Sequence, residues 1–237
     1  MSSVSRRTFL GATAAALPAT VWAAPSDKVV VGVMGAGGRG TSLAKTFAGL
    51  PNVEVAYVCD PDEKRVNAAA AAVGKGGKSQ PKAVGDFRRI LDDKAVDALV
   101  CAAPNHWHGP ATILACAAGK HVYVEKPCSH TAREAELMVE AARKHDRRVQ
   151  VGTQRRSYPG IQEAVAKLHD GVIGRVYFAQ GWYTNDRASI GNGKEGPPPA
   201  GLDYDLWQGP VPRRPFRTNT LHYTWHWFWH WGNGLLP

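Results

Sequence analysis

Short, continuous apolar runs alternate with longer mixed segments along most of this chain. Valine-rich runs occupy residues 28–34, 53–59, 96–102, 122–124 and 148–151, with a shorter candidate over 82–84. Continuous β-branched runs of this length are typical of strands buried on both faces of a sheet. The mixed segments between them, 37–48, 61–73, 86–91, 109–118 and 131–144, have the composition of helices. This alternation predicts an α/β fold, a doubly wound parallel sheet, over residues 24–152.

Local end signals support several of these helices. Pro61 stands at the predicted start of one helix and Gly119 at the predicted end of another. Thr131 followed by Glu134 has the spacing of a capping box, in which each residue satisfies a free backbone N–H of the helix. We therefore expect a helix to begin at residue 131.

The pattern changes after Gly152. We expect a helix over 159–168, an aromatic and β-branched strand over 174–184, and a loop rich in glycine and proline over 185–201. Near the end, tryptophans at 225, 227, 229 and 231 alternate with period two, which favours a strand with an aromatic face. Residues 153–237 thus predict the start of an α+β second domain, with too few elements to complete one.

The first residues predict an export signal. Ser5 to Leu10 (SRRTFL) resembles the twin-arginine motif, and residues 11–21 form a small apolar run too short to span a bilayer. Small residues around Ala23 suit cleavage after that position. We expect residues 1–23 to be a signal peptide for the twin-arginine export machinery, which would place the protein in the periplasm or otherwise outside the cytoplasm.

Charge and cysteine content exclude some functions. The formal net charge is +9, but the basic residues are scattered and no nucleic-acid-binding motif is present. We predict no nucleic-acid partner. Cys59 and Cys101 end apolar runs and Cys116 lies in an apolar helix, where free cysteine behaves as a small hydrophobic residue. We therefore expect no disulfide among these three; Cys128 follows a motif discussed below.

A glycine-rich turn carries the first candidate site. Residues 35–40 (Gly35, Ala36, Gly37, Gly38, Arg39, Gly40) match G-x-G-x-x-G, follow a predicted buried strand and open a predicted helix. Such glycines permit a tight turn, a close approach of the pyrophosphate and close helix–strand packing, so they predict a dinucleotide-binding Rossmann fold. Asp60 ends the next strand, where a carboxylate binds the ribose hydroxyls of NAD and repels the 2′-phosphate of NADP. Lys64 and Arg65 keep NADP open as an alternative.

Several further segments resemble one enzyme family. These are APNHWH at 103–108, AGKHVYVEKP at 118–127, VGTQRRS at 151–157, LDYDLWQGP at 202–210 and HYTWHWFWHWGNG at 222–234. Together with the glycine turn they resemble the glucose–fructose oxidoreductase, inositol dehydrogenase and rhizopine-catabolism family (Gfo/Idh/MocA), and its exported subgroup. The resemblance implies a nicotinamide-dependent oxidoreductase acting on a CH–OH group of a sugar or polyol, and we expect the full-length protein to be a homo-oligomer.

The resemblance also implies roles for individual residues. Lys126, in the EKP segment, would lie beside the nicotinamide and stabilise charge on the reacting oxygen as the catalytic residue. Glu125 would position the ribose or the lysine, and Pro127 would fix the turn, with a cis bond as one option. Pro104, Asn105 and His106 are expected at the nicotinamide-ribose pocket.

Other polar residues near the predicted cleft have less defined roles. Gln154, Arg155 and Arg156 are candidates for substrate or phosphate contact, with interdomain ion pairs as the alternative. His108 is expected to cap the following helix. His222, His226 and His230 have helical spacing, but the tryptophan alternation conflicts with a helix, so we predict no metal site.

One departure from the family pattern limits the assignment. Family members continue into a helix that carries a histidine and an aspartate, the histidine serving as the acid–base partner, and this sequence ends before that motif. We therefore expect the chain to be a fragment or a truncated product. One alternative is an NAD-dependent glycoside hydrolase of the same fold, a branch that the resemblance implies lacks the EKP lysine. Another is a dinucleotide-binding protein without catalytic activity.

Overall fold

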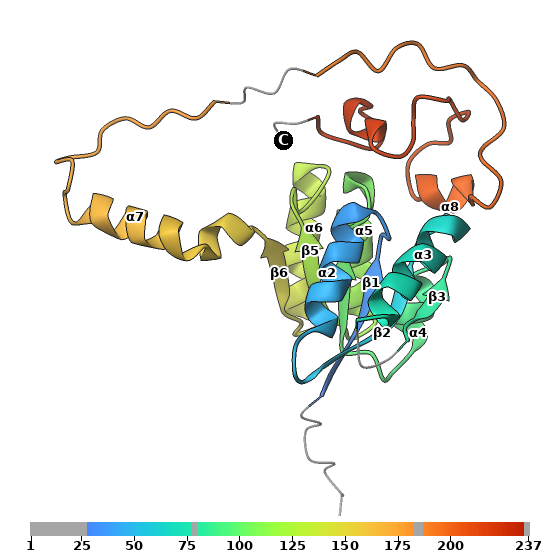
Figure 1. The fold of residues 1–237 in the computed structure, drawn as a ribbon, viewed down its shortest axis with the longest axis horizontal. Coiled ribbons are helices and arrows are strands. Elements are labelled where there is room, and N and C mark those ends of the chain that lie inside the picture. Colours follow the sequence, from blue (N-terminus) through green and yellow to red (C-terminus); the bar gives the residue numbers. More distant parts are fainter. Residues whose placement is uncertain (1–27, 77–79, 183–186, 235–237) are drawn as a thin grey trace, which may run out of the picture.

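The structure, a computed structural model, describes residues 28–76, 80–182 and 187–234. The predicted signal peptide, residues 1–23, lies outside this range. Within it, six parallel strands form one sheet in the order β3-β2-β1-β4-β5-β6 (Figure 1). They are β1 (Val29–Met34), β2 (Val53–Cys59), β3 (Lys82–Val84), β4 (Ala98–Cys101), β5 (His121–Glu125) and β6 (Val149–Gly152). This order is that of the doubly wound Rossmann fold, so the predicted fold class is confirmed.

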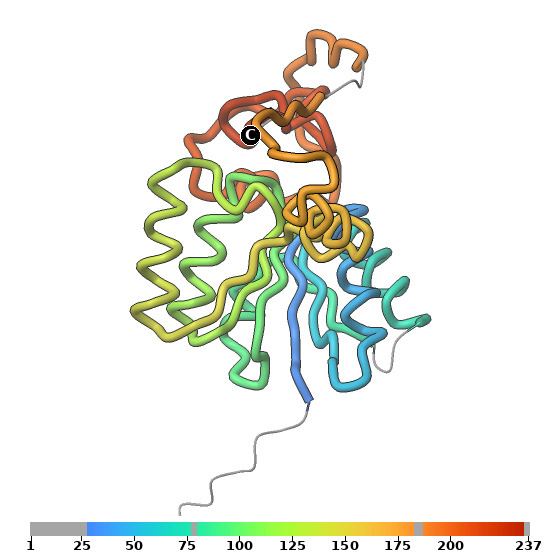
Figure 2. Tube along the Cα trace, turned by 90° about the vertical axis from the view of Figure 1, so that its left-hand side faces the viewer, coloured from blue at the N-terminus to red at the C-terminus, as the bar shows by residue number. Residues whose placement is uncertain are grey.

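Helices cover both faces of the sheet, as Figure 2 shows. α2 (Gly38–Ala48) and α3 (Glu63–Gly74) pack on one face, with Val31 and Val33 of β1 in their shared core. α4 (Arg88–Asp92), α5 (Asn105–Ala117) and α6 (Ala132–Lys144) cover the other face, where Met34 joins their core. Successive residues of β1 therefore point into different cores, which explains why its sequence is apolar without interruption.

The ends of two helices differ in detail from the sequence prediction. α3 begins at Glu63 rather than Pro61, because the Asp62 side chain caps it by accepting hydrogen bonds from the N–H groups of Lys64 and Arg65. α6 is capped by Thr131, whose hydroxyl accepts from the N–H of Glu134 at 3.2 Å. The Glu134 carboxylate accepts in return from the N–H of His130, one residue before the cap.

The predicted strand over 174–184 is wrong for the residues that the structure describes, 174–182; residues 183–184 lie outside them. After η1 (Gln154–Ser157) and α7 (Pro159–His169), residues 175–182 adopt no regular secondary structure. Tyr177, Phe178 and Trp182 are exposed by 91%, 71% and 76%. The chain runs away from the sheet here (Figure 1), so no neighbouring strand supplies the hydrogen bonds that an isolated strand needs.

The aromatic tail also differs from its prediction. It forms a short 3-10 helix, η2 (Thr224–Trp227), rather than a strand. Together with α8 (Tyr204–Gln208) it builds a small aromatic core of Tyr204, Trp207, Phe216, Trp225 and Trp231. The period-two pattern misleads because Trp225 and Trp231 are buried while Trp229 stays 84% exposed. We call residues 200–234 the aromatic cap.

The aromatic cap lies over the carboxyl edge of the sheet (Figure 1) and is fastened there at several points. Near β2, Leu202 forms an antiparallel bridge with Asp62, and the N–H of Glu63 donates to the carbonyl of Gly201 at 2.9 Å. Near β4, Asn105 donates through its amide to the side chain of Asn233 at 3.0 Å. The cap therefore contacts the edge at which Rossmann folds bind their ligands.

Two further observations complete the fold. Cys59, Cys101 and Cys116 are buried as free thiols among apolar residues, as the sequence predicts. Across residues 28–76, 80–182 and 187–234, helices of sufficient length and apolar character to cross a membrane are absent.

Candidate dinucleotide and active site

A cavity of about 540 Å³ lies between the carboxyl edge of the sheet and the aromatic cap. From the sheet it is lined by the glycine turn after β1, by Asp60 after β2, by the start of α5 and by Glu125 and Lys126 after β5. From the cap it is lined by Leu206, Trp207, His222, Tyr223, Trp225 and His226. The topology thus brings together most of the residues that the sequence marks as functional.

The glycine turn leaves no room for side chains at two positions. Gly35 has φ of +94°, and a Cβ added there would lie 2.6 Å from the Ala102 backbone. A Cβ at Gly40 would lie 1.7 Å from the carbonyl oxygen of Gly35. Gly37 stands at the N-cap of α2 without a side chain to cap it, and Gly37, Gly38 and Arg39 line the cavity. The first turn of α2 therefore presents unpaired N–H groups and its positive dipole end to the cavity, as a pyrophosphate requires.

Asp60 is held in place by the turn it faces. Its carboxylate accepts hydrogen bonds from the N–H of Ala36 at 2.7 Å and from the N–H of Asp62 at 3.0 Å. The side chain is 9% exposed, and burial raises its pKa despite those two bonds and the nearby Arg65. The remaining lone pairs of the carboxylate can accept from two ribose hydroxyls. The cradle and this acceptor fit a dinucleotide.

Arg65 lies on the same side of the cavity. Its Nη1 would be 3.2 Å from a Cβ at Gly37, so the guanidinium sits directly beside the glycine turn. The side of the cavity near the end of β2 therefore has both the carboxylate of Asp60 and the guanidinium of Arg65. Lys64, the other basic residue noted in the sequence, does not line the cavity.

Glu125 and Lys126 occupy the opposite end of the cavity. Glu125 is 5% exposed and accepts from Nε of Arg39 at 2.8 Å, which ties the glycine turn to the end of β5. Lys126 lines the cavity with a solvent-exposed side chain, and its bond to Pro127 is cis, as the sequence suggested. The carbonyl of Pro127 lies 2.5 Å from Nδ1 of His108, which fixes the turn from behind.

The histidines of α5 do not have their expected roles. α5 begins at Asn105, so His106 and His108 lie inside the helix and His108 does not cap it. His106 is 1% exposed and does not line the cavity; its ring lies between the carbonyls of Trp207 at 3.0 Å and Trp231 at 3.3 Å. His106 thus fastens the aromatic cap to the sheet domain. Pro104 and Asn105 line the cavity.

Of the three candidate substrate contacts after β6, one lines the cavity and two do not. Gln154 lines the cavity, whereas Arg155 and Arg156 lie in η1 with exposed side chains and do not reach it. The sequence could not distinguish them, because adjacent residues of a 3-10 turn point in different directions. Their expected contact with substrate is not supported by this geometry.

The cap contributes residues that were not predicted to line the cavity. His222 pairs with Asp62, with Nε2 and Oδ2 3.0 Å apart, and burial and Arg65 lower the pKa of His222. His226 and Trp225 stack with ring centroids 3.6 Å apart. The histidines at 222, 226 and 230 do not converge: among the described residues, groups of three or more His, Cys, Asp or Glu side chains able to hold a metal are absent. In the sequence this segment was marked by its family resemblance, its aromatic residues and the spacing of its histidines, none of which predicts that it lines the cavity.

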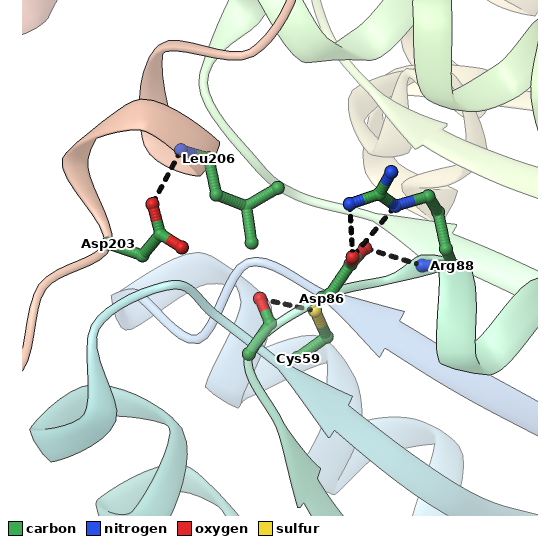
Figure 3. A network of polar contacts seen from close by, with 6 residues as sticks. Cys59, Asp86, Arg88, Asp203 and Leu206 are labelled. Carbon is green, nitrogen blue, oxygen red and sulfur yellow. Dashed lines mark hydrogen bonds and ion pairs between the residues drawn. The ribbon is translucent and has the colours of Figure 1, made fainter.

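Figure 3 shows α8 of the cap beside the end of β2, and both Leu206 and Cys59 line the cavity. Leu206 of α8 points toward Cys59 at the end of β2, and the Sγ of Cys59 donates to the carbonyl of Gly85 at 3.5 Å. Asp203 caps α8 by accepting from the N–H of Leu206 at 2.8 Å. An N-cap thus places an apolar side chain against the cavity wall.

Comparison with known proteins agrees with this geometry. Residues 29–153 match the model of the Gfo/Idh/MocA oxidoreductase family with an NAD-binding Rossmann fold, which is more than half of the chain. The chain belongs to this family. The family's NAD-binding Rossmann domain is therefore the domain that carries the glycine turn and Asp60 in this member.

The curated relatives include a glycosyl hydrolase and a dehydrogenase. A glycosyl hydrolase family 109 protein from Saccharopolyspora erythraea is 35% identical over 165 residues, 68% of this chain and 36% of that protein. A levoglucosan dehydrogenase from Pseudarthrobacter phenanthrenivorans is 29% identical over 159 residues, 66% of this chain and 41% of that protein. The chain thus spans less than half the length of these two relatives.

Solved structures of other oxidoreductases share the fold. An NAD-binding oxidoreductase from Klebsiella pneumoniae is 29% identical with a TM-score of 0.53, over 62% of this chain and 40% of that chain. A myo-inositol 2-dehydrogenase from Lactobacillus plantarum has a TM-score of 0.57 at 23% identity, over 63% of this chain and 43% of that chain, and shows the fold alone.

Proposed function

We propose that this oxidoreductase binds NAD in the cavity under its aromatic cap and transfers hydride to or from a carbinol carbon of a sugar or polyol. One observation carries the proposal: a single cavity is lined by Asp60 after β2, by the glycine turn after β1 and by Lys126 after β5, in the order of the strands along the sheet. A dinucleotide seated by its pyrophosphate on α2 then has its ribose on Asp60 and its second half directed toward Lys126.

The residues of this chain supply binding and charge stabilisation. When bound, the nicotinamide supplies the hydride acceptor or donor. The backbone of the glycine turn binds the pyrophosphate and the carboxylate of Asp60 binds the adenosine ribose. The ammonium of Lys126 stabilises negative charge developing on the substrate oxygen.

The test has two stages. We expect NAD to bind, measured by calorimetry, and turnover of levoglucosan or myo-inositol to appear as NADH absorbance. Lys126→Met keeps most of the side-chain volume and removes the charge, so NAD binding should persist while kcat falls by about 10²–10³. A chain that binds no dinucleotide, or a Lys126→Met variant with unchanged kcat, contradicts the proposal.

A second function has a specific observation in its favour. The glycosyl hydrolase family 109 relative is the more similar of the two curated relatives described above. Such an enzyme would oxidise a sugar transiently and reduce it again, so p-nitrophenyl glycosides would be cleaved without net formation of NADH. NAD binding without turnover of polyols or glycosides would instead favour a dinucleotide-binding protein without catalytic activity.

Export is also part of the proposal. The twin-arginine-like segment at Ser5 to Leu10 supports a location outside the cytoplasm. Replacing Arg6 and Arg7 by lysine should leave the protein in the cytoplasm, measured by cell fractionation. Periplasmic recovery of this double variant would argue against the export route.

A further inference from the structure

Part of the cavity lining is a connected group of apolar and aromatic residues. Its members are Cys59, Gly85, Phe87, Trp107, Leu206 and Trp207, and we call them the apolar wall. The Sγ of Cys59 donates to the carbonyl of Gly85 at 3.5 Å. The rings of Phe87 and Trp107 meet edge to face with centroids 5.3 Å apart, and Nε1 of Trp107 donates to the carbonyl of Trp207 at 3.0 Å. The sheet and the aromatic cap therefore build this wall together.

The apolar wall lies beside Asp60. Cys59 pairs in register with Val84 of β3, and the N–H of Asp60 donates to the carbonyl of Val84 at 3.1 Å. Lys126 follows β5, three strands further along the sheet. In the proposed function Asp60 binds the adenosine ribose. The base attached to that ribose then reaches the apolar wall, whose aliphatic and aromatic side chains suit the flat faces of a purine.

Leu206 is the residue of this wall that α8 directs into the cavity. Leu202, four residues earlier in the chain, packs against the aromatic core of the cap, whereas Leu206 is half-buried and lines the cavity. Figure 3 shows the Leu206 side chain directed toward the end of β2. The N-cap Asp203 fixes that orientation by accepting from the N–H of Leu206 at 2.8 Å. An aliphatic side chain in this position stabilises a ligand whose apolar surface covers it.

We propose that the aromatic cap completes the adenosine half of the dinucleotide site, with Leu206 as its contact to the adenine ring. This inference rests on the proposed function and adds to it a binding residue outside the Rossmann domain. Phe87 and Trp107 form the part of the adenine site that comes from the sheet domain, and Leu206 forms the part that comes from the cap.

The cap is fastened to the segment that follows Asp60. The N–H of Asp203 donates to the carbonyl of Pro61 at 3.0 Å. Nε2 of His222 lies 3.0 Å from Oδ2 of Asp62, and the N–H of Asp62 donates to the Asp60 carboxylate at 3.0 Å. These contacts couple the position of the cap to the carboxylate that we propose binds the ribose. Loss of a contact within such a formed site acts mainly on the rate of dissociation.

The experiment compares Leu206→Ala with Leu202→Ala in the full 237-residue chain. Both variants remove the same atoms from the same cap, but Leu202 does not line the cavity and its backbone bridge to Asp62 is kept. We expect Leu206→Ala to weaken NAD and ADP-ribose by about tenfold in calorimetry, through faster dissociation in stopped-flow measurements. Leu202→Ala should lose more stability in urea denaturation and keep its NAD affinity within about twofold.

Two further measurements separate a contact with adenine from a general loosening of the cap. Leu206→Met fills nearly the same volume, so it should keep the NAD affinity within about twofold. In the wild type with NAD bound, NMR should show nuclear Overhauser effects between the adenine protons and the Leu206 methyl groups.

The inference has outcomes of its own that would overturn it. Unchanged NAD affinity in Leu206→Ala, an equal loss in Leu202→Ala, or adenine protons without an Overhauser effect to Leu206 would each reject the adenine contact. These results leave the proposed function in place, because NAD still binds and Lys126 is untouched. A wild-type chain that binds no NAD rejects both.

Discussion

At the scale of single residues, the glycine turn and its carboxylate depend on each other. Asp60 accepts from the N–H of Ala36, so the acidic residue that we propose binds the ribose also holds the turn that we propose binds the pyrophosphate. A change on either side alters both halves of the adenosine site. A carboxylate can be buried at this position because backbone N–H groups donate hydrogen bonds to its oxygens.

Gly40→Ala should disrupt this site from within. The new methyl group would lie 1.7 Å from the carbonyl oxygen of Gly35, a backbone atom that cannot move without moving β1 or α2. We expect a loss of about 1–3 kcal/mol in the free energy of unfolding, measured by urea denaturation, and weaker NAD binding. Gly38→Ala is the control for stability, since its Cβ would meet nothing within 4 Å. Equal stability of the two variants would contradict the close contact.

At the scale of elements, the sequence predicted the sheet well because a strand buried on both faces has a continuous run of apolar residues. β1 and β2 are valine-rich and β4 is entirely apolar for that reason. The motif residues follow the strands whose carboxyl ends meet. The prediction of a strand over 174–182 was wrong because a strand needs a neighbouring strand to pair with, and the local sequence does not show whether one is present. His106 was likewise predicted to contact the cofactor, but its ring lies between the carbonyls of Trp207 and Trp231. These carbonyls belong to the cap and reach His106 only in the folded chain, so the sequence could not show the contact.

Asp62 connects two elements and tests how the cap is fastened. Its carboxylate caps α3 and also pairs with His222 of the cap. Asp62→Ala removes both interactions and should lower the free energy of unfolding by about 1–2 kcal/mol. Asp62→Asn keeps a good N-cap and loses only the carboxylate on His222, so its loss in urea denaturation should be smaller. If both variants lose the same amount, the helix cap contributes nothing measurable.

At the scale of the whole molecule, the active cavity exists only while the cap is docked. The sheet supplies one wall and the cap the other, and the contacts between them are mostly hydrogen bonds to backbone carbonyls around a small aromatic core. His106 is central to this docking because a single ring reaches two segments of the cap. Docking of the cap, and with it the cavity, therefore depends on the protonation state of the His106 ring.

Acid should weaken the molecule through His106. Burial lowers its pKa to about 4, while the bonds to the Trp207 and Trp231 carbonyls oppose this. In the unfolded chain His106 takes up a proton below about pH 6.5, whereas in the folded chain it does so only below its lowered pKa of about 4. The contribution of His106 to the free energy of unfolding is therefore fully present above about pH 6.5 and is lost as the pH falls from there to about 4. The loss attributable to His106 is on the order of 3 kcal/mol. Other histidines with lowered pKa values add to the slope in wild type, so the measurement is the difference in urea denaturation between wild type and His106→Gln from pH 7 to pH 4. Glutamine can still donate to the carbonyls but does not titrate, and a slope identical to that of wild type would show that His106 is not a neutral, buried link between the sheet and its cap.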